Sequence, residues 1–209
     1  MSRPVKIYYG LSGTFKTTTI NSNLNLGDSV LWSSIKRWKK WEKDLLENLN
    51  HPNDLNLALL HLSRLGDLNF DLSKDDTTLH IERGVSDMLF YWKRIRERPI
   101  GYDEDDFVKN IINEELDIID RVSGGTKEPE KILLIQKDYD FVQNTVLKEP
   151  SRSNCFPRGV QDYMDAQDRY ISFTKEYNKI TSEIVISNAK DYLNGLGIEW
   201  ENPEINNEN

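Results

Sequence analysis

Apolar residues follow two patterns along this chain, and the two patterns alternate. Short apolar runs, such as those in Val5–Tyr9 and Lys131–Gln136, are bounded by turn residues, which is typical of buried parallel strands. Longer segments, such as Gln161–Asn178, place apolar residues at steps of three and four, which predicts amphipathic helices. Strands that alternate with helices indicate a three-layer α/β/α domain with a parallel sheet.

The same patterns divide residues 1–200 into the elements of a single domain, without an internal repeat or a linker. The predicted strands are Val5–Tyr9, Ser29–Ser33, Thr77–Ile81, Lys131–Gln136 and Glu183–Ile186. The first predicted helix runs from Thr17 to Leu24 or Leu26. The other predicted helices are Ile35–Leu49, Leu55–Leu65, Ser86–Arg98, Asp103–Val122, Asp138–Leu147, Gln161–Asn178 and Asn188–Leu193. Residues 201–209 are acidic and rich in asparagine, and we expect this tail to be frayed.

The stretch from Val5 to Ile20, VKIYYGLSGTFKTTTI, contains the parts of a phosphate-binding loop. The first predicted strand ends before Gly10, and Lys16-Thr17 opens the first predicted helix. Backbone N–H groups at a helix N-terminus carry partial positive charge, the lysine adds a full charge, and the next hydroxyl can bind Mg²⁺. The residues expected to bind a nucleotide are Gly10, Ser12, Gly13, Thr14, Lys16, Thr17 and Thr18.

The loop departs from the usual pattern G-x-x-x-x-G-K-[ST] at one position. Gly10 and Lys16-Thr17 fit the pattern, but Phe15 stands where the second glycine belongs. Gly13 lies slightly earlier and can supply the flexibility instead. The alternative interpretation is an ordinary strand, turn and helix with an exposed lysine. The strand and helix on either side favour the phosphate loop, because that context is what the motif requires.

A second group of candidate site residues follows the strand predicted at Thr77–Ile81. Glu82-Arg83 come directly after this strand, at the end where open α/β sheets bind ligands. A carboxylate can hold Mg²⁺ through water, and an arginine can hold a phosphate with two parallel hydrogen bonds. The alternative is a surface pair at a strand end, and the phosphate loop in the same chain favours the site.

Composition and charge narrow the functional classes. The chain has 209 residues and a net charge of −8, which argues against general binding of duplex nucleic acid. Cys155 is the only cysteine, so no disulfide forms within the chain, and His51, His61 and His80 lack zinc-ligand spacing. The apolar runs are too short to cross a bilayer. We therefore expect a cytoplasmic protein of a reducing compartment, without a membrane partner.

The segment between the predicted helices Asp138–Leu147 and Gln161–Asn178 has the composition of a lid. Lys148–Gly159 is polar, contains two prolines and carries three cations. No apolar periodicity ties it down, so we expect a mobile lid at residues 148–159. Cations in loops are common, and the alternative is that at most one or two of them act on a ligand.

The motifs together resemble the nucleoside and nucleotide kinase family of phosphate-loop proteins. GLSGTFKTT is similar to the family's phosphate loop, and IERGVSDMLFY resembles the Glu-Arg-Ser segment of deoxynucleoside kinases and the Asp-Arg segment of thymidylate kinases. Residues 131–178 resemble the family's fourth strand, the helix after it, an arginine-bearing lid and a long helix. The resemblance implies a five-stranded parallel sheet and the use of ATP and Mg²⁺.

The resemblance also implies roles for individual residues. Lys16 would bridge the β- and γ-phosphates of ATP, and Thr17 would bind Mg²⁺, with Glu82 as a second metal contact. Glu82 and Arg83 would act between the donor and the acceptor. A set of cations that neutralises the transferred phosphoryl group suits this reaction. The expected lid cations are Lys148, Arg152 and Arg158.

The end of the second strand bears on the acceptor. Deoxynucleoside kinases carry a glutamate there as the base for a sugar hydroxyl, whereas this chain has Trp32-Ser33-Ser34. A phosphate acceptor is already ionised, so we expect a nucleoside monophosphate, as in thymidylate kinases, although their Arg-Glu-Pro segment is missing here. The expected acceptor contacts are Trp32, Arg37, Glu82, Arg83 and Phe90. The alternative for the aromatic residues among them is a place in the core.

Two other functions stay open from the sequence. The acceptor could be a nucleoside, a modified base or a nucleic-acid end. The chain could also bind nucleotides without catalysis, with a loop that has decayed at Phe15. The expected partner is a small nucleotide substrate, with a nucleic acid as the less favoured acceptor, and formation of a homodimer stays open.

Overall fold

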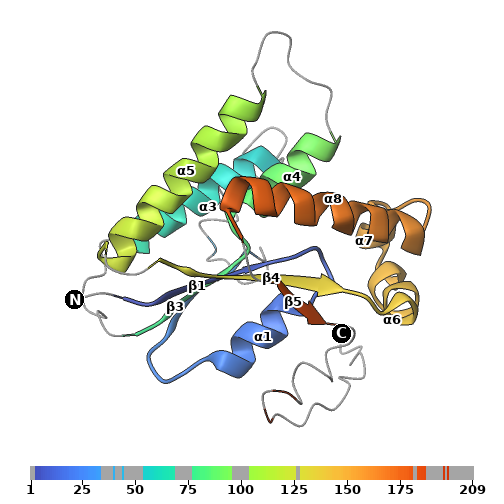
Figure 1. Ribbon diagram of the computed structural model, residues 1–209, viewed down its shortest axis with the longest axis horizontal. Helices are drawn as coiled ribbons and strands as arrows, with labels where there is room; N and C mark the ends of the chain where they lie inside the picture. Colours follow the sequence, from blue (N-terminus) through green and yellow to red (C-terminus); the bar gives the residue numbers. More distant parts are fainter. Residues whose placement is uncertain are drawn as a thin grey trace.

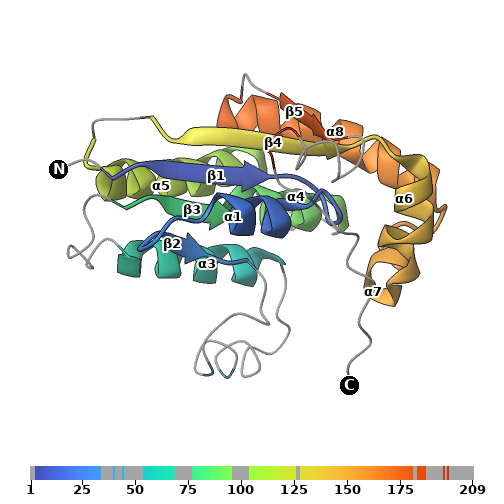
Figure 2. The same ribbon diagram turned by 90° about the horizontal axis from the view of Figure 1, so that it is seen from below.

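The computed structural model describes residues 3–33, 40, 44, 54–68, 77–95, 104–125, 128–180, 183–186, 195 and 197. The strands are β1 (Val5–Tyr9), β2 (Ser29–Leu31), β3 (Leu79–Glu82), β4 (Glu130–Gln136) and β5 (Glu183–Ile186). They form one parallel sheet in the order β2-β3-β1-β4-β5 (Figure 1, Figure 2). The predicted α/β architecture with a parallel sheet is therefore confirmed.

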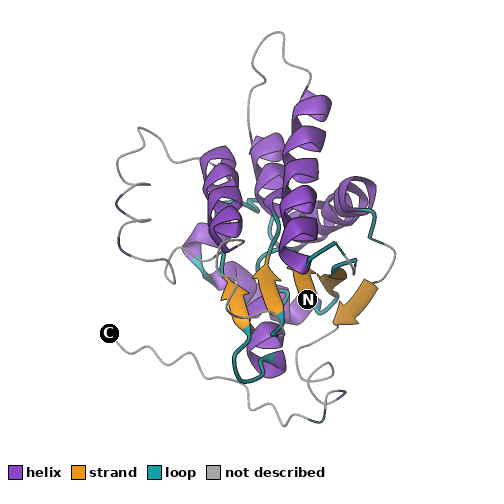
Figure 3. Ribbon diagram, turned by 90° about the vertical axis from the view of Figure 1, so that its left-hand side faces the viewer, coloured by secondary structure: helices purple, strands orange, loops and turns teal. Residues whose placement is uncertain are grey.

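Helices cover both faces of this sheet. They are α1 (Lys16–Asn23), α3 (Asp54–Leu68), α4 (Val85–Ile95), α5 (Glu104–Ser123), α6 (Tyr139–Asn144), α7 (Pro150–Ser153) and α8 (Val160–Asn178), with a 3-10 turn η3 (Val146–Lys148). Figure 1 shows α3, α4, α5 and α8 on one face and α1 on the other, and Figure 3 shows the same layers from the side. The short elements α6 and α7 stand beyond the carboxyl end of β4 (Figure 1).

β1 is the central strand, and its two neighbours lie on opposite sides of it. Tyr8 of β1 pairs with Glu82 of β3, and Tyr9 pairs with Leu133 of β4. The chain passes from one side of β1 to the other between β3 and β4, so the strand order changes direction there. Open α/β sheets bind ligands beyond the carboxyl ends of their strands at such a switch point. The loop after β1 occupies this place.

Side chains of β1 alternate between two separate hydrophobic cores. Ile7 and Tyr9 belong to the larger core, which residues of α3, α4, α5 and α8 complete. Tyr8 belongs to a smaller core with Ile20 of α1 and Leu134 of β4. Successive side chains of a strand point to opposite faces of its sheet, so one short strand anchors both helix layers and holds the following loop rigidly at its base.

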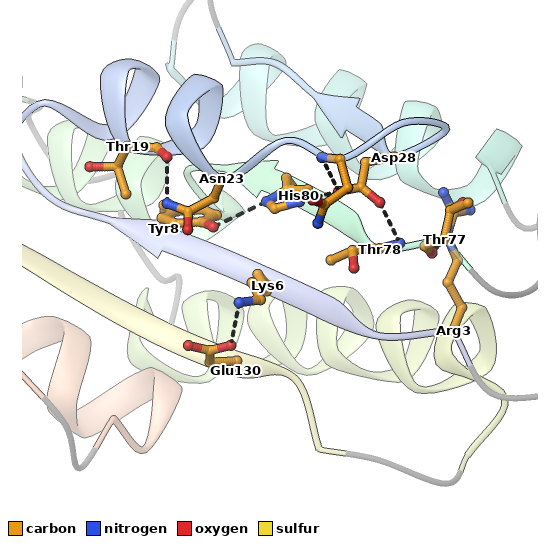
Figure 4. A network of polar contacts seen from close by, with 11 residues as sticks. Arg3, Lys6, Tyr8, Thr19, Asn23, Asp28, Thr77, Thr78, His80 and Glu130 are labelled. Atoms are coloured by element: carbon orange, nitrogen blue, oxygen red, sulfur yellow. Dashed lines mark hydrogen bonds and ion pairs between the residues drawn. The ribbon is translucent and has the colours of Figure 1, made fainter. Parts of the chain in front are cut away.

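A buried polar relay fastens the α1 side of the sheet (Figure 4). The hydroxyl of Tyr8 lies 3.0 Å from Nδ1 of His80, and Nε2 of His80 lies 3.1 Å from a carboxylate oxygen of Asp28. Asp28 also accepts hydrogen bonds from the backbone amides of Asn25 and Thr78. Burial lowers the pKa of His80 against the opposing effect of Asp28. The relay therefore joins β1, β3 and the turn before β2 through a neutral ring at pH 7.

Two predicted strands have different ends in the structure. β2 stops at Leu31, two residues before the predicted end at Ser33. β3 begins at Leu79 and includes Glu82, whereas the prediction ended the strand at Ile81. Parallel pairing with β1 extends to Glu82, and this pairing fixes the position of the acidic residue that the sequence places in a turn.

Some predictions fall on residues outside the described part of the chain. They are the helices Ile35–Leu49 and Asn188–Leu193 and the tail 201–209, although Lys40 and Asp44 are described and helical. Within the described residues, no helix combines the length and the apolarity that crossing a bilayer requires.

The segment 148–159 is folded, which corrects the expected unstructured polar loop. It contains the end of η3 and all of α7. Phe156 is 3% exposed, and its ring packs edge-on against Tyr163 of α8 with 5.1 Å between centroids. A single buried aromatic residue has no periodicity, so pattern reasoning could not detect this anchor. Closure of the segment over a ligand stays a prediction.

Candidate phosphate-binding site

The loop between β1 and α1 depends on its two glycines. Gly10 has a φ of 149° and Gly13 a φ of 89°, values that other residues rarely adopt. A β-carbon on Gly10 would collide with the Thr14 hydroxyl and the Leu134 carbonyl, and one on Gly13 would collide with Val146. The close approach of β4 and η3 to the loop therefore requires glycine at both positions.

Phe15 adopts a left-handed backbone conformation, the region that favours glycine. Its φ is 60° and its ψ is 23°, a conformation that costs a non-glycine residue about 1–2 kcal/mol. Its carbonyl accepts a helical hydrogen bond of 2.8 Å from the Thr19 amide. Its ring packs against Phe141 of α6 with 4.8 Å between centroids. The departure from the pattern thus leaves the path of the loop intact.

Lys16 lies at the N-terminus of α1 and is held by the loop itself. Its Nζ donates to the carbonyls of Gly10 at 2.6 Å and Leu11 at 2.7 Å, and to the Thr14 hydroxyl at 3.2 Å. Burial, followed by the charge of Arg83, lowers the pKa of Lys16 to about 7. The ammonium group and the N–H groups at this helix end are the groups that favour phosphate oxygens.

Glu82 connects the start of α1 with the residues after β2. One carboxylate oxygen accepts a hydrogen bond from the Thr17 hydroxyl. The other accepts from the amide of Ser33 at 3.3 Å and from its hydroxyl at 3.0 Å. Burial acts to raise the pKa of Glu82, but the Thr17 hydrogen bond and the charges of Lys16 and Arg83 hold it below its usual value. Glu82 is therefore ionised at neutral pH.

The oxygens of Thr17 and Glu82 fit a magnesium ion, because Mg²⁺ prefers hydroxyl, carboxylate and phosphate oxygens. Both residues line the same cavity. In the described part of the chain, no group of three or more His, Cys, Asp or Glu residues could hold a metal by itself. A magnesium ion at this place would therefore also need phosphate oxygens of a bound ligand, which is its usual arrangement in phosphate-transfer sites.

The phosphate loop, the end of β3 and part of the segment 148–159 line one cavity of about 300 Å³. Arg83 lies on its wall with a left-handed backbone at φ 63°, and its guanidinium donates to the Ser12 hydroxyl at 3.1 Å. Arg152 of α7 reaches the same cavity and also pairs with Glu149 at 2.9 Å. The lining residues are Ser12, Gly13, Phe15, Lys16, Thr17, Thr18, Glu82, Arg83, Phe141, Thr145 and Arg152.

Three described residues of the predicted acceptor site and lid lie outside this cavity. Phe90 is buried in the larger core on the inner face of α4, as the alternative interpretation expected. Trp32 is partly buried and packs against the smaller core. Arg158 has a side chain that is 68% exposed and pairs with Asp162, one helical turn away, at 3.0 Å. Arg37 lies outside the described residues.

Two loop residues expected to contact the nucleotide form hydrogen bonds with other groups of the protein. Thr14 is fully buried, and its hydroxyl donates to the Leu11 carbonyl at 3.0 Å. The amide of Gly10 donates to the Tyr170 hydroxyl at 2.9 Å. Neither residue belongs to the cavity lining, and their predicted contact with the nucleotide stays a prediction.

Sequence reasoning missed three residues that hold the loop from behind. The Tyr170 hydroxyl accepts from Gly10 and donates to Asp87 at 2.8 Å, and the Tyr163 hydroxyl donates to the Ser12 carbonyl at 2.8 Å. Burial raises the pKa of Asp87 to about 6. The two tyrosines are two helical turns apart and therefore share one face of α8. That spacing was the only signal, and it does not reveal that this face meets the loop.

The architecture resembles that of a solved thymidylate kinase. The enzyme from Candida albicans matches with a TM-score of 0.50 and 13% sequence identity, over 94% of this chain and 90% of that chain. A likeness at this identity concerns the fold alone, and the chain accordingly has a fold like that of this thymidylate kinase. This agrees, at the level of fold, with the family that the motifs resemble. No protein-family model and no curated protein sequence matches the chain.

Proposed function

We propose that this protein uses ATP and Mg²⁺ to phosphorylate a (deoxy)nucleoside monophosphate. The observation that carries the proposal is the gathering of Lys16, Thr17, Glu82 and Arg83 around one cavity at the carboxyl ends of β1 and β3. A helix N-terminus, a lysine and an arginine all favour phosphate oxygens. The fold of this chain is similar to that of a solved thymidylate kinase, and this similarity agrees with the proposed class of reaction.

The four residues take different roles in the proposal. Lys16 exchanges its loop carbonyls for the β- and γ-phosphate oxygens of ATP. Thr17 and Glu82 would hold Mg²⁺, whose charge would offset negative charge on the phosphates. Arg83 holds the acceptor phosphate through two parallel hydrogen bonds, for which its planar guanidinium is suited.

In the proposed reaction, an oxygen of the acceptor phosphate forms a bond to the γ-phosphorus of ATP. The bond between the γ-phosphorus and its bridging oxygen breaks, and the electron pair leaves with ADP. The acceptor oxygen is already ionised, so no side chain has to remove a proton. Arg152 on the cavity wall provides a cation for the charge on the transferred group, since positioning and charge stabilisation dominate this reaction.

The end of β2 supports a monophosphate rather than a nucleoside as acceptor. A sugar hydroxyl benefits from a carboxylate base, and the residue after Trp32 is Ser33. The nearby carboxylate of Glu82 accepts hydrogen bonds from Thr17 and Ser33, and its pKa is held below the usual value. A carboxylate stabilised in this way is a weak base, so a pre-ionised acceptor suits the site better.

Incubating the protein with γ-labelled ATP and a panel of nucleosides, nucleoside monophosphates and short DNAs tests the proposal. Label on a monophosphate supports it, and label on a nucleoside or a DNA end supports the alternative acceptors. ATP binding without any transfer supports a non-catalytic nucleotide-binding protein.

Lys16→Ala provides the reference variant for this panel. Losing a contact made mainly in the transition state costs roughly 3 kcal/mol or more, at least about a hundredfold in rate. Lys6→Ala is the matched control, because Lys6 only forms a surface pair with Glu130 at 3.0 Å. Near-normal turnover by Lys16→Ala would contradict the phosphate-loop assignment.

A further inference from the structure

Two aromatic rings line the phosphate cavity beside the start of α1. Phe15 and Phe141, here called the aromatic wall, have ring centroids 4.8 Å apart and planes inclined at 45°. Both residues are partly buried, and both belong to the lining of the cavity. Phe15 packs against the smaller core and Phe141 against the larger one, and neither ring has a role in the proposed reaction.

Phe141 and the Glu82-Arg83 pair lie on opposite sides of the loop. Phe141 belongs to α6, which follows β4, whereas Glu82 ends β3. These two strands flank β1 on its two sides. A phosphate group at the N-terminus of α1 therefore lies between Arg83 on the β3 side and an aromatic side on the β4 side, where Phe141 and Arg152 line the cavity. If Arg83 holds the acceptor, the aromatic side is left for the remainder of the donor.

The conformation of Phe15 also points to a role for its ring. The left-handed backbone at this position is suited to glycine, which the usual loop pattern supplies. Phe15 adopts it nonetheless, and its ring is packed against Phe141 at the edge of the cavity. Residues held in unfavourable backbone conformations cluster at ligand sites. The phenylalanine is thus a replacement that keeps the loop and adds an aromatic surface.

We infer that the aromatic wall binds the flat base of the nucleoside triphosphate donor. Aromatic faces stack on nucleobases of every type, because each base has a planar π-face. The hydroxyl of Thr145, which lines the same cavity, supplies a polar group next to the rings. The inference rests on the proposed function, since it takes the phosphate donor to be a nucleotide.

The test compares ATP with inorganic tripolyphosphate, which carries the phosphates without a base. Calorimetry with Mg²⁺ should show ATP binding roughly ten- to hundredfold more tightly than tripolyphosphate to the wild-type protein. Phe141→Leu, which keeps an apolar side chain but removes the aromatic face, should remove most of this difference and leave the tripolyphosphate affinity unchanged. Tyr139→Leu is the control, because Tyr139 lies on the same helix and is 57% exposed.

Equal affinities of the wild-type protein for the two ligands would overturn the inference. So would an unchanged ratio in Phe141→Leu, or an equal loss of affinity in Tyr139→Leu. Failure of the proposed function gives a different result. If ATP binds in a base-dependent way through Phe141 but no acceptor is phosphorylated, the aromatic-wall inference is supported and the proposed reaction is contradicted. Transfer with a base-independent donor site leaves the reaction in place and removes the aromatic wall.

Discussion

The hydroxyl of Tyr163 donates a hydrogen bond of 2.8 Å to the carbonyl oxygen of Ser12. The ring of the same tyrosine packs edge-on against Phe156, with 5.1 Å between centroids. Phe156 is the buried anchor of the segment 148–159, and Ser12 belongs to the phosphate loop. One side chain of α8 therefore contacts both the segment predicted to close over a ligand and the loop predicted to bind it.

Tyr163→Phe removes this hydrogen bond and keeps the ring. We expect the affinity for ATP to fall about fivefold, because a typical hydrogen bond contributes about 1 kcal/mol, while the contact with Phe156 keeps the fold. Calorimetric titration with ATP measures the change, and Tyr139→Phe, altered at a 57% exposed residue, controls for loss of a hydroxyl. An affinity equal to wild type in Tyr163→Phe would mean that this bond does not position the loop.

Arg83→Lys separates a bidentate phosphate contact from a simple charge. A lysine keeps the charge but cannot form two parallel hydrogen bonds, so we expect the acceptor KM to rise or the turnover to fall at least tenfold. ATP binding should change little, because the proposed contact of Arg83 is with the acceptor. Steady-state kinetics with varied acceptor measure this, with Arg121→Lys as a control whose side chain is 59% exposed. Wild-type kinetics with every acceptor would reduce Glu82-Arg83 to a structural pair.

Limited trypsin digestion tests whether the segment 148–159 closes over ligands. Arg152 lines the cavity, whereas Arg158 is 68% exposed outside it. We expect ATP and the acceptor together to slow cleavage after Arg152 several-fold more than cleavage after Arg158. Mass spectrometry of the fragments gives both rates in one experiment. Identical cleavage at both arginines with and without ligands would argue against a lid.

Glu115 should make the stability of the protein depend on pH. It lies buried 3.7 Å from His61. Burial raises the pKa of Glu115 to about 8 and lowers that of His61 to about 3, so both are neutral at pH 7 and form no ion pair there. Between pH 4.5, the ordinary pKa of Glu, and about pH 8, the folded state keeps a proton that the unfolded state has lost. The contribution of Glu115 to the free energy of unfolding therefore falls as the pH rises through this window.

Glu115→Gln removes this titration and isolates its effect. The stability of the variant relative to wild type should increase by up to about 1.4 kcal/mol per pH unit between pH 5 and 8, and then level off. Urea unfolding at four pH values measures the difference, in which the contribution of His61 cancels. Glu114→Gln, at a neighbouring exposed position, is the control. A pH-independent difference would show that Glu115 stays ionised in the fold.

The strands and the phosphate loop could be predicted from the sequence because their signals are local. An apolar run such as Glu183–Ile186 specifies a buried strand, and Gly10 with Lys16-Thr17 specifies a loop whose backbone path tolerates few residues. Phe15 stands where the usual pattern has glycine, and it adopts a left-handed backbone conformation that favours glycine.

The rest of the site depends on contacts between distant segments. Arg152 and Arg158 belong to the same polar stretch of the sequence. In the fold, Arg152 lines the cavity, whereas Arg158 pairs with Asp162. Phe90 carries a pattern that fits a base pocket and a core equally well, and the packing of α4 on α8 decides for the core. Tyr170 reaches Gly10 across most of the chain length, which no spacing in the sequence reveals.

The amine of Lys16 is close to its titration midpoint, because burial lowers its pKa to about 7. Phosphate oxygens favour the protonated form, so binding a nucleotide near neutral pH should take up a fraction of a proton from the solvent. Heats of binding should then differ between buffers of different ionisation enthalpy, and equal heats would mean that the lysine is always charged. Nucleotide occupancy and protonation would form one linked equilibrium, in which a more alkaline medium loosens the hold of the loop on its ligand.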